Sequence, residues 1–168
     1  MLTDLVQIRR LGEKKRDENL RLRMHLKRRN YQERRLIRIA QGIEEAIDCT
    51  ACANCCRVAT TRITDRDVEK LARYFRMSKE RFMAEYTQED EEEGRILKKN
   101  ESGCVFLDGN LCSVYEVRPH TCVTFPHLTH GAGSLVSRLW EMPDRATYCP
   151  IVYNTLEAWK EDLESGQR

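Results

Sequence analysis

The sequence predicts an α+β fold in which a long basic helix precedes a small cysteine-ligated domain of short helices and hairpins. Residues 1–48 contain no proline and are rich in arginine, leucine, glutamate and lysine, a composition typical of helix. The rest of the chain holds all eight cysteines, and from residue 95 onward short apolar runs alternate with turn residues. We therefore expect a basic N-terminal helical extension over residues 1–48 and a cysteine-cluster domain over residues 49–168.

The net charge of +2 is unevenly distributed along the chain. Residues 1–48 carry 13 basic and 8 acidic side chains, whereas the remaining residues carry 16 basic and 19 acidic ones. The basic excess therefore belongs to the N-terminal segment, and any electrostatic attraction to a partner is expected there.

The N-terminal segment is expected to be helical from about Thr3 to Asp48, with a break near Gly12. Apolar residues recur near its end at three- and four-residue spacing, namely at Leu36, at Ile39 or Ala40, and at Ile43 and Ile47. This stripe predicts that the last third of the helix packs on the domain. The part from Arg21 to Arg38 is dense in charge, and we expect it to face solvent or a partner.

Two short helices are predicted after the first cysteines. Thr64 and Asp67 resemble a capping box, and the helix that they begin has an apolar face formed by Val68, Leu71, Ala72 and Phe75. Ser78 is expected to cap the second helix. The acidic run at residues 88–94 is interpreted as a solvated linker or a frayed helix end.

The remaining residues predict short strands, turns and a closing helix. Strands are expected at residues 96–97, 104–107, 111–112 and 135–140. Asp108-Gly109 is typical of a hairpin turn. A helical turn at Val114–Val117 should end at Arg118, because the proline that follows disfavours helical backbone there. The closing helix is expected over Ile151–Leu163.

Four of the eight cysteines lie within Cys49–Cys56, in the pattern C-x2-C-x2-C-C. Two-residue gaps turn the backbone so that successive sulfurs face one point, and clustered thiolates prefer zinc, copper(I) or iron–sulfur clusters to hard cations. The adjacent pair Cys55-Cys56 is unusual for a single zinc ion, because neighbouring side chains diverge. It suits two centres or one larger cluster.

The cysteine segments together resemble one known family. C-x2-C-x2-C-C is followed by C-x-F-L before a hairpin, by C-x-V-Y-x-x-R-P-x-x-C-x-x-F-P and by a late C-P, in that order from Cys49 to Pro150. This arrangement resembles the CxxCxxCC (YkgJ-like) family of zinc- or iron-chelating proteins. The resemblance implies a metal-ligand set of all eight cysteines: Cys49, Cys52, Cys55, Cys56, Cys104, Cys112, Cys122 and Cys149.

The metal itself stays open at this point, with iron favoured over zinc. The first three cysteines repeat the start of ferredoxin-type cluster motifs, whose remaining ligand is a cysteine followed by proline, as at Cys149-Pro150. Eight thiolates would equally make two closed four-thiolate zinc sites. We therefore expect an iron–sulfur cluster or iron, with zinc as the alternative.

Arg118 and His120 lie beside Cys122 in the sequence and are candidates to support the ligands. Arg118 is expected either to donate hydrogen bonds to the sulfurs or to nearby loop carbonyls, or to be a solvent-facing turn residue. His120 is expected either to approach the site or to be an ordinary surface residue, as are His127 and His130.

The basic residues of the N-terminal helix suggest a partner-binding face. The candidate nucleic-acid contacts are Lys27, Arg28, Arg29, Arg34 and Arg35. A solvated face or a protein-binding face explains the same residues, because charge alone does not read bases.

The sequence shows neither a signal peptide nor a membrane-spanning stretch, so a cytoplasmic location is expected. Thiols stay reduced there, which favours metal binding over the disulfide framework that an even cysteine count also allows. We expect a metal-binding protein that serves electron transfer, cluster delivery or metal-dependent modification of a partner. The alternative is a structural zinc module that binds nucleic acid or protein. Whether the chain is an enzyme stays open, because no nucleophile–base set stands out.

Overall fold

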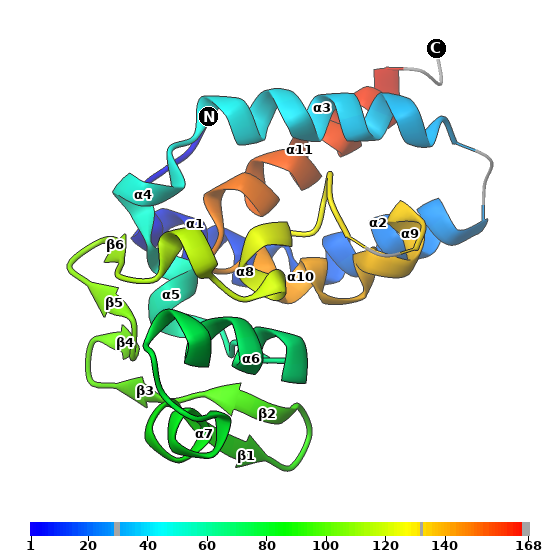
Figure 1. Cartoon of the computed structure of the whole chain (residues 1–168). Helices are drawn as coiled ribbons and strands as arrows, with labels where there is room; N and C mark the ends of the chain where they lie inside the picture. The colour runs from blue at the N-terminus through cyan, green and yellow to red at the C-terminus, as the bar shows by residue number, and fades with distance from the viewer. Residues whose placement is uncertain (29–30, 132, 166–168) are drawn as a thin grey trace. The chain divides into compact units, whose positions relative to one another are not determined.

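A computed structural model describes residues 1–28, 31–131 and 133–165 (Figure 1). The chain divides into two compact units, one formed by Met1–Asp48 together with Pro126–Arg168 and the other by Cys49–Phe125. Helices predominate, and the strands form three separate antiparallel pairs. The predicted α+β class is confirmed.

Helices and helical turns are the regular secondary structure of the first unit's described residues. Its elements are α1 Leu5–Lys14, α2 Arg16–Arg28, α3 Glu33–Ala46, α9 Leu135–Arg138, the 3-10 turn η2 Leu139–Glu141, α10 Met142–Arg145 and α11 Pro150–Ser165.

The prediction of a long N-terminal helix with a break near Gly12 is confirmed only in part, because three helices, α1, α2 and α3, occupy this segment. α1 ends at Lys14, and the next residue, Lys15, donates its backbone N–H to the carbonyls of Leu11 and Glu13. α3 starts afresh after Gln32, whose backbone is extended. Gly12 lies inside α1, and a Cβ there would stand 2.5 Å from the Ala146 carbonyl oxygen. This glycine therefore allows close packing and does not end the helix.

α11 forms the centre of the first unit, and the predicted closing helix is confirmed. α3 and α11 lie side by side in Figure 1. Trp159 is fully buried, and its Nε1 donates a hydrogen bond of 2.9 Å to the Leu36 carbonyl. Leu22, Leu26 and Leu36 are also buried, so the expectation that residues 21–38 face outward is wrong for this apolar face.

The predicted strand at residues 135–140 is wrong. Ser134 caps a helix there, with its side chain accepting from the Ser137 amide, and α9 continues directly into η2. Leu135 and Leu139 are buried four residues apart, which is helical spacing. The capping serine was the local signal that favoured helix.

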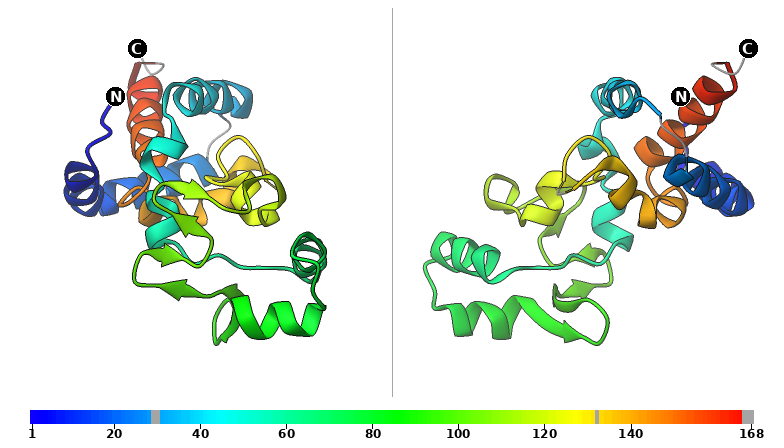
Figure 2. Two further views of the ribbon diagram at one scale, coloured as in Figure 1. Left: turned by 60° about the vertical axis from the view of Figure 1, so that its left-hand side comes forward. Right: turned by 90° about the vertical axis from the view of Figure 1, so that its right-hand side faces the viewer.

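The second unit combines short helices with hairpins. Its elements are α4 Cys49–Cys52, α5 Asn54–Val58, α6 Asp65–Tyr74, α7 Lys79–Tyr86, β1 Thr87–Asp90, β2 Gly94–Leu97, β3 Lys99–Asn100, β4 Gly103–Cys104, β5 Leu107–Asp108, β6 Leu111–Cys112, the 3-10 turn η1 Tyr115–Val117 and α8 His120–Thr124. The three strand pairs follow one another in chain order, with β3–β4 lying between β1–β2 and β5–β6 (Figures 1 and 2).

Both predicted helices of this unit are confirmed with their caps. Thr64 and Asp67 form a reciprocal capping box on α6, and Ser78 accepts from the Arg81 amide at the start of α7. The helices pack on a core that includes Phe82 and Phe106. Cys104 and Cys112 pack against the same core, so the thiols are built into the structure of this unit.

The prediction that the acidic run at residues 88–94 is a linker or a frayed helix end is wrong. These residues form the first hairpin of the unit. Gln88 pairs with Ile96 in β1–β2, and Gly94 adopts φ +72 after the turn. The Asp90 carboxylate accepts the amides of Glu92 and Glu93 at 3.0 and 2.9 Å. The acidic side chains point to solvent, so their charge does not oppose strand pairing.

Two further hairpins place the cysteines of the middle of the chain. Cys104 pairs with Lys99 in β3–β4, and Cys112 pairs with Leu107 in β5–β6. The predicted turn after Asp108 is confirmed. Each thiol therefore stands at the end of the second strand of its own hairpin.

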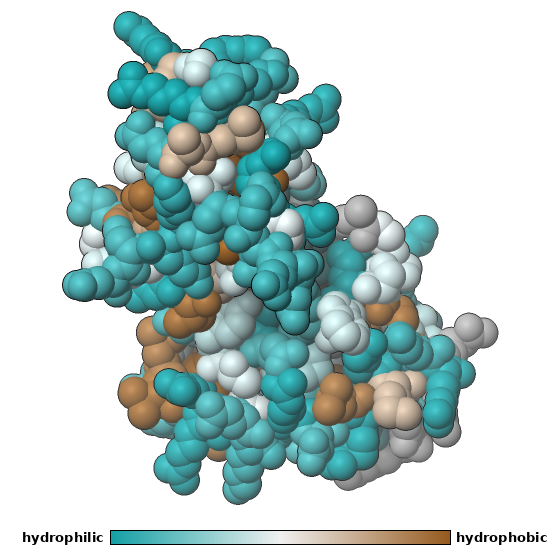
Figure 3. All heavy atoms as spheres, turned by 90° about the horizontal axis from the view of Figure 1, so that it is seen from below, coloured by the Kyte–Doolittle hydropathy of each residue, from teal (hydrophilic) through white to brown (hydrophobic). Residues whose placement is uncertain are grey.

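Charged and polar side chains cover most of the face shown in Figure 3, where the exposed apolar side chains form separate areas. Within the described part of the chain, no helix combines the length and the apolar character that crossing a membrane requires.

Candidate metal centre

The cysteine loop consists of two helical turns joined at Ala53. This residue has φ +45, in the left-handed region, and it is buried. A non-glycine residue in that conformation is strained, and such strain is common at functional sites. The resulting bend separates Cys49 and Cys52 on α4 from Cys55 and Cys56 on α5.

Arg57 and Asn110 hold this loop against the turn of the β5–β6 hairpin. The Arg57 guanidinium donates to the Cys52 carbonyl at 2.9 Å, to the Gly109 carbonyl at 3.0 Å and to the Asn110 Oδ1. Asn110 returns a bond from its Nδ2 to the Ala51 carbonyl at 3.0 Å. Both helical turns of the loop are thus bound to the hairpin that carries Cys112.

Gly103 lets the β4 strand approach α5 more closely than any other residue would. Its φ is +124, and a Cβ at this position would lie 2.7 Å from both the Arg57 Cα and the Cys56 carbonyl oxygen. Both the backbone conformation and the close approach therefore require glycine. The neighbouring residue Cys104 is brought to the helix that carries Cys56.

Asp67 connects the segment that carries Cys122 to α6. The buried carboxylate accepts the His120 amide at 2.9 Å and the Thr64 amide at 3.1 Å, and Lys70 donates to the Arg118 carbonyl at 2.6 Å. Burial opposes ionisation of Asp67, but the hydrogen bonds and the charge of Lys70 outweigh it and lower the pKa of the carboxyl. Hydrogen bonds from Asp67 and Lys70 therefore attach the turn before Cys122 to α6.

Four thiols from these separate segments gather close to one another: Cys56, Cys104, Cys112 and Cys122. Every pair among the four interacts electrostatically. Burial, and after it the sulfurs of the other three, raise the pKa of Cys122 to about 12. Burial likewise raises the pKa of Cys104 and of Cys112, with Cys56 adding to it.

Cys56 behaves in the opposite way. Its sulfur lies 4.0 Å from that of Cys55, and the hydrogen bond from this neighbour is the largest cause of a Cys56 pKa lowered to about 6. The positive charges of Arg57 and Arg118 lower it as well. The group therefore contains one cysteine, Cys56, that is deprotonated at neutral pH. The other three keep their protons at that pH because their pKa values are raised.

A bound cation would remove this resistance, because it stabilises the buried thiolates and compensates their mutual repulsion. Soft sulfur donors in a set of four suit zinc or iron. Among the residues that the structure describes, no three cysteine, histidine or acidic side chains stand in metal-binding geometry. The chemistry of the donor set suits such a metal, and its side chains would have to move closer together to bind one ion.

The other predicted ligands are placed differently. Cys49 is exposed, Cys52 and Cys55 are half-buried in the same loop, and Cys149 is buried in the first unit, just before α11. Cys52 is not in a disulfide, and neither are the four thiols of the gathered group. The ligand role of all eight cysteines stays a prediction.

The two predicted supporting residues differ in what they contact. The Arg118 guanidinium lies 4.0 Å from the centre of the Tyr115 ring, and its charge lowers the pKa of Cys56 and of Cys112. His120 is exposed and contributes its backbone amide to Asp67. Supporting roles for both side chains stay predictions.

The candidate nucleic-acid contacts lie on α2 and α3 of the first unit. Lys27, Arg28, Arg34 and Arg35 are exposed, and Arg35 donates to Asp162 at 2.9 Å. Arg29 lies outside the described residues.

Sequence reasoning did not identify Arg57, Asn110, Gly103 or Asp67 as parts of the site. The R-P-x-x-C segment was recognisable, but these four residues act across long sequence separations. The only local signal was the capping box that contains Asp67.

Comparison with known proteins concerns the segment that carries the cysteines. No curated protein and no solved structure matches the chain. Residues 48–150, which include all eight cysteines, match the CxxCxxCC family. The chain therefore belongs to this family, which is described as a putative zinc- or iron-chelating domain.

Proposed function

We propose that this zinc- or iron-chelating protein holds iron or an iron–sulfur cluster, and that it serves electron transfer, cluster delivery or metal-dependent modification of a protein partner. The observation that carries the proposal is the gathering of Cys56, Cys104, Cys112 and Cys122, in which every pair interacts. An iron centre held there would supply one-electron chemistry.

Cys56 is the natural first ligand of the incoming metal. Its pKa of about 6 makes it a thiolate at neutral pH, before any metal is present. The other three thiols release their protons as the cation approaches, so binding is favoured as the pH rises.

Arg57 and Arg118 balance the charge of such a centre. Four thiolates exceed the charge of one divalent or trivalent iron, and both guanidinium groups act on the Cys56 sulfur. Arg57 also fixes the loop through its carbonyl contacts, so it combines a positioning role with an electrostatic one.

Cys49, Cys52 and Cys55 are proposed to serve a second metal position or the transfer of metal to and from the four-thiol group. Cys49 is exposed and the other two are half-buried, so the loop is accessible to a partner or to an incoming ion. Cys149 completes the eight-cysteine set in this proposal. The cytoplasm is the proposed location, because it keeps these thiols reduced.

A structural zinc site is the second candidate function. Four thiolates match the closed tetrahedral sites that stabilise small zinc domains. In this case the exposed basic residues Lys27, Arg28 and Arg34 would bind nucleic acid or a protein partner. If the protein binds no RNA or DNA even at low salt, the hypothesis of nucleic-acid binding is contradicted.

Metal analysis of anaerobically purified full-length protein separates the two candidates. The iron proposal predicts stoichiometric iron, visible charge-transfer absorption and an EPR signal in one oxidation state. Colourless protein with stoichiometric zinc and no iron would contradict it and support the zinc candidate.

A further inference from the structure

The two tryptophans of the chain both lie in the first unit, and the fold treats them in opposite ways. Trp159 is fully buried, whereas Trp140, in η2, is 66% exposed. Tryptophan is highly buried on average in folded proteins, and an indole left in solvent is common at binding surfaces. Trp140 is therefore a candidate contact for a ligand of the first unit.

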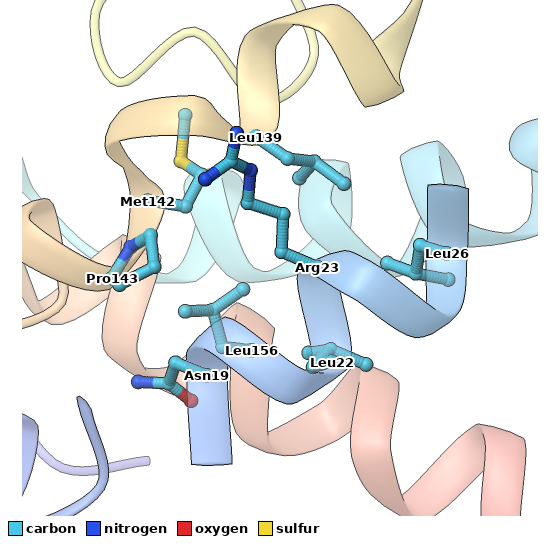
Figure 4. Close-up of a pocket in the computed structure, with 8 residues that line it drawn as sticks. All are labelled: Asn19, Leu22, Arg23, Leu26, Leu139, Met142, Pro143 and Leu156. Carbon is cyan, nitrogen blue, oxygen red and sulfur yellow. The ribbon is translucent and has the colours of Figure 1, made fainter. Parts of the chain in front are cut away.

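The Arg23 side chain lies against this indole. Its guanidinium carbon is 5.2 Å from the centre of the Trp140 ring, a distance typical of a cation–π contact. Figure 4 shows the Arg23 side chain extending from α2 toward Leu139 and Met142, where it helps to line a small, mostly apolar pocket. These contacts hold the guanidinium beside the ring. Because Trp140 is nevertheless 66% exposed, much of the indole remains accessible to a second flat group.

Arg23 and Lys27 make the surroundings of the indole positive. They lie four residues apart on α2 and are therefore neighbours on one face of the helix. None of the ion pairs found among residues 1–28, 31–131 and 133–165 includes either of them. Lys27 is exposed, so its ammonium group can meet a ligand without any rearrangement of the fold.

The carboxylates next to Trp140 in the sequence do not offset these charges, because other cations already pair with them. Glu141 is paired with Arg145, and Asp144 is paired with Arg16. The positive charge beside the indole is therefore left for a ligand.

An accessible indole flanked by unpaired cations suits a ligand that carries both flat rings and negative charges. Single-stranded nucleic acid offers both, because its bases are free to stack on aromatic side chains and each nucleotide carries a phosphate. A duplex keeps its base faces inside its own stack. An acidic protein segment would pair with the cations but would leave the indole without a stacking partner.

We propose that Trp140, Arg23 and Lys27 bind single-stranded nucleic acid, with one base stacked on the Trp140 indole and the flanking phosphates paired with Arg23 and Lys27. The proposal deepens the hypothesis of nucleic-acid binding in the second candidate function. It uses residues of the first unit only, so it does not depend on which metal the cysteines hold. Metal content and oligonucleotide binding are separate measurements, and each can fail without the other.

Titration of the full-length protein with oligo(A) and oligo(dA) at low salt tests the stacking contact. Trp140 is the exposed tryptophan, so we expect its emission to be quenched in parallel with the rise in anisotropy of a labelled oligonucleotide. Trp140→Ala should abolish the quenching and weaken binding about tenfold. Tyr74→Ala removes an exposed ring from the second unit and should leave both readouts unchanged.

The salt dependence of binding tests the phosphate contacts. Lys27→Met should weaken binding to every oligonucleotide alike and lower the slope of log affinity against log salt by about 0.7. Arg21→Met removes the same charge from another face of α2 and should change the slope less.

An abasic oligonucleotide of equal length separates stacking from charge. We expect it to bind about tenfold more weakly than oligo(dA) and to leave the tryptophan emission unquenched. The proposal is overturned if neither oligonucleotide binds, if the abasic strand binds as tightly as oligo(dA), or if Trp140→Ala binds as the unsubstituted chain does. Polyglutamate binding as tightly as the oligonucleotides would assign the surface to an acidic protein segment and would also overturn it.

Discussion

Cys56 and Cys122 show how strongly position in the fold controls the chemistry of a thiol. The Cys55 hydrogen bond and two nearby arginines lower the pKa of Cys56 to about 6. Burial among other sulfurs raises that of Cys122 to about 12. Both residues belong to one group of four, so the same metal would meet a thiolate on one side and a protonated thiol on the other.

Alkylation of the metal-free protein tests this difference. The rate at Cys56, followed by iodoacetamide labelling and mass spectrometry, should reach half its maximum near pH 6, because the thiolate is the reactive form. Cys122 should stay unlabelled up to pH 9. Cys55→Ala removes the lowering hydrogen bond and should move the Cys56 midpoint upward, whereas Cys49→Ala should leave it in place. A Cys56 midpoint between pH 8 and 9 in the unsubstituted chain would contradict the assignment.

Gly103 makes a second prediction at the level of single residues. Gly103→Ala should cost about 3 kcal/mol of unfolding free energy, because it combines a strained φ with contacts of 2.7 Å to backbone atoms of α5. Gly109 also has a positive φ, +57, but a Cβ there would meet open space. Gly109→Ala should therefore cost about 1 kcal/mol of unfolding free energy. Urea denaturation of the metal-free protein measures both. Equal losses would show that the close approach of β4 to α5 does not matter.

The sequence identified the cysteines of the site but not the residues that bring them together. Cysteine spacing is visible along the chain because soft-metal ligands recur at short intervals. The contact of Gly103 with Cys56 joins residues 47 positions apart, and that of Arg57 with Asn110 joins residues 53 apart. No local pattern encodes such a contact.

At the level of elements, the cysteine loop and the β5–β6 hairpin act as one part through Arg57 and Asn110. Arg57→Met keeps the aliphatic stem of the side chain but removes the bonds to Cys52, Gly109 and Asn110. We expect metal affinity to fall about 10- to 100-fold, as is usual when residues that orient metal ligands are lost.

Competition with a chromophoric chelator measures this affinity. The shift of the sulfur-to-cobalt charge-transfer band in the Co(II)-substituted protein distinguishes a changed ligand geometry from a general loss of stability. Arg66→Met, at an exposed position on α6, is the matched control and should leave both readouts unchanged. If Arg57→Met binds the metal with unaltered affinity, Arg57 does not position the metal ligands.

Asp67 links α6 to α8, and its contribution should depend on pH. Its folded pKa lies below the unfolded value of about 3.9, so the carboxylate stabilises the fold above that pH. The stability is lost as the pH falls through the folded pKa. Asp67→Asn should therefore cost about 2 kcal/mol at pH 7, with the difference shrinking in acid.

Denaturation midpoints measured between pH 7 and pH 2 test this prediction. Asp65→Asn alters an exposed carboxylate in the same helical turn and should change stability much less. A deficit of Asp67→Asn that stays constant down to pH 2 would show that the charge is not what stabilises the fold.

Helices with a cap in the sequence were predictable, and elements defined by tertiary contacts were not. The capping box at Thr64 and the cap at Ser78 are local, and both helices form as predicted. The acidic run at residues 88–94 gives no strand signal, because its pairing depends on Ile96 and Leu97 being buried. The short run at residues 135–140 is apolar enough for strand or helix, and packing in the first unit decides for helix.

At the level of the whole molecule, the cysteines are shared between two compact units. Seven lie in the unit formed by residues 49–125, and Cys149 lies in the other unit, together with the basic N-terminal helices. The sequence indicated a change of composition at residue 48. It did not indicate that residues 126–168 pack with the N-terminal helices, because that packing joins the two ends of the chain.

X-ray absorption at the metal edge of the anaerobically purified full-length protein tests the central claim, that Cys56, Cys104, Cys112 and Cys122 hold one metal centre. The account predicts a first coordination shell dominated by sulfur, with about four neighbours, near 2.3 Å if the metal is zinc. Cys122→Ser should replace one of these sulfurs with oxygen or nitrogen or release the metal. A shell of nitrogen and oxygen only, or a sulfur count that Cys122→Ser leaves unchanged, would contradict it.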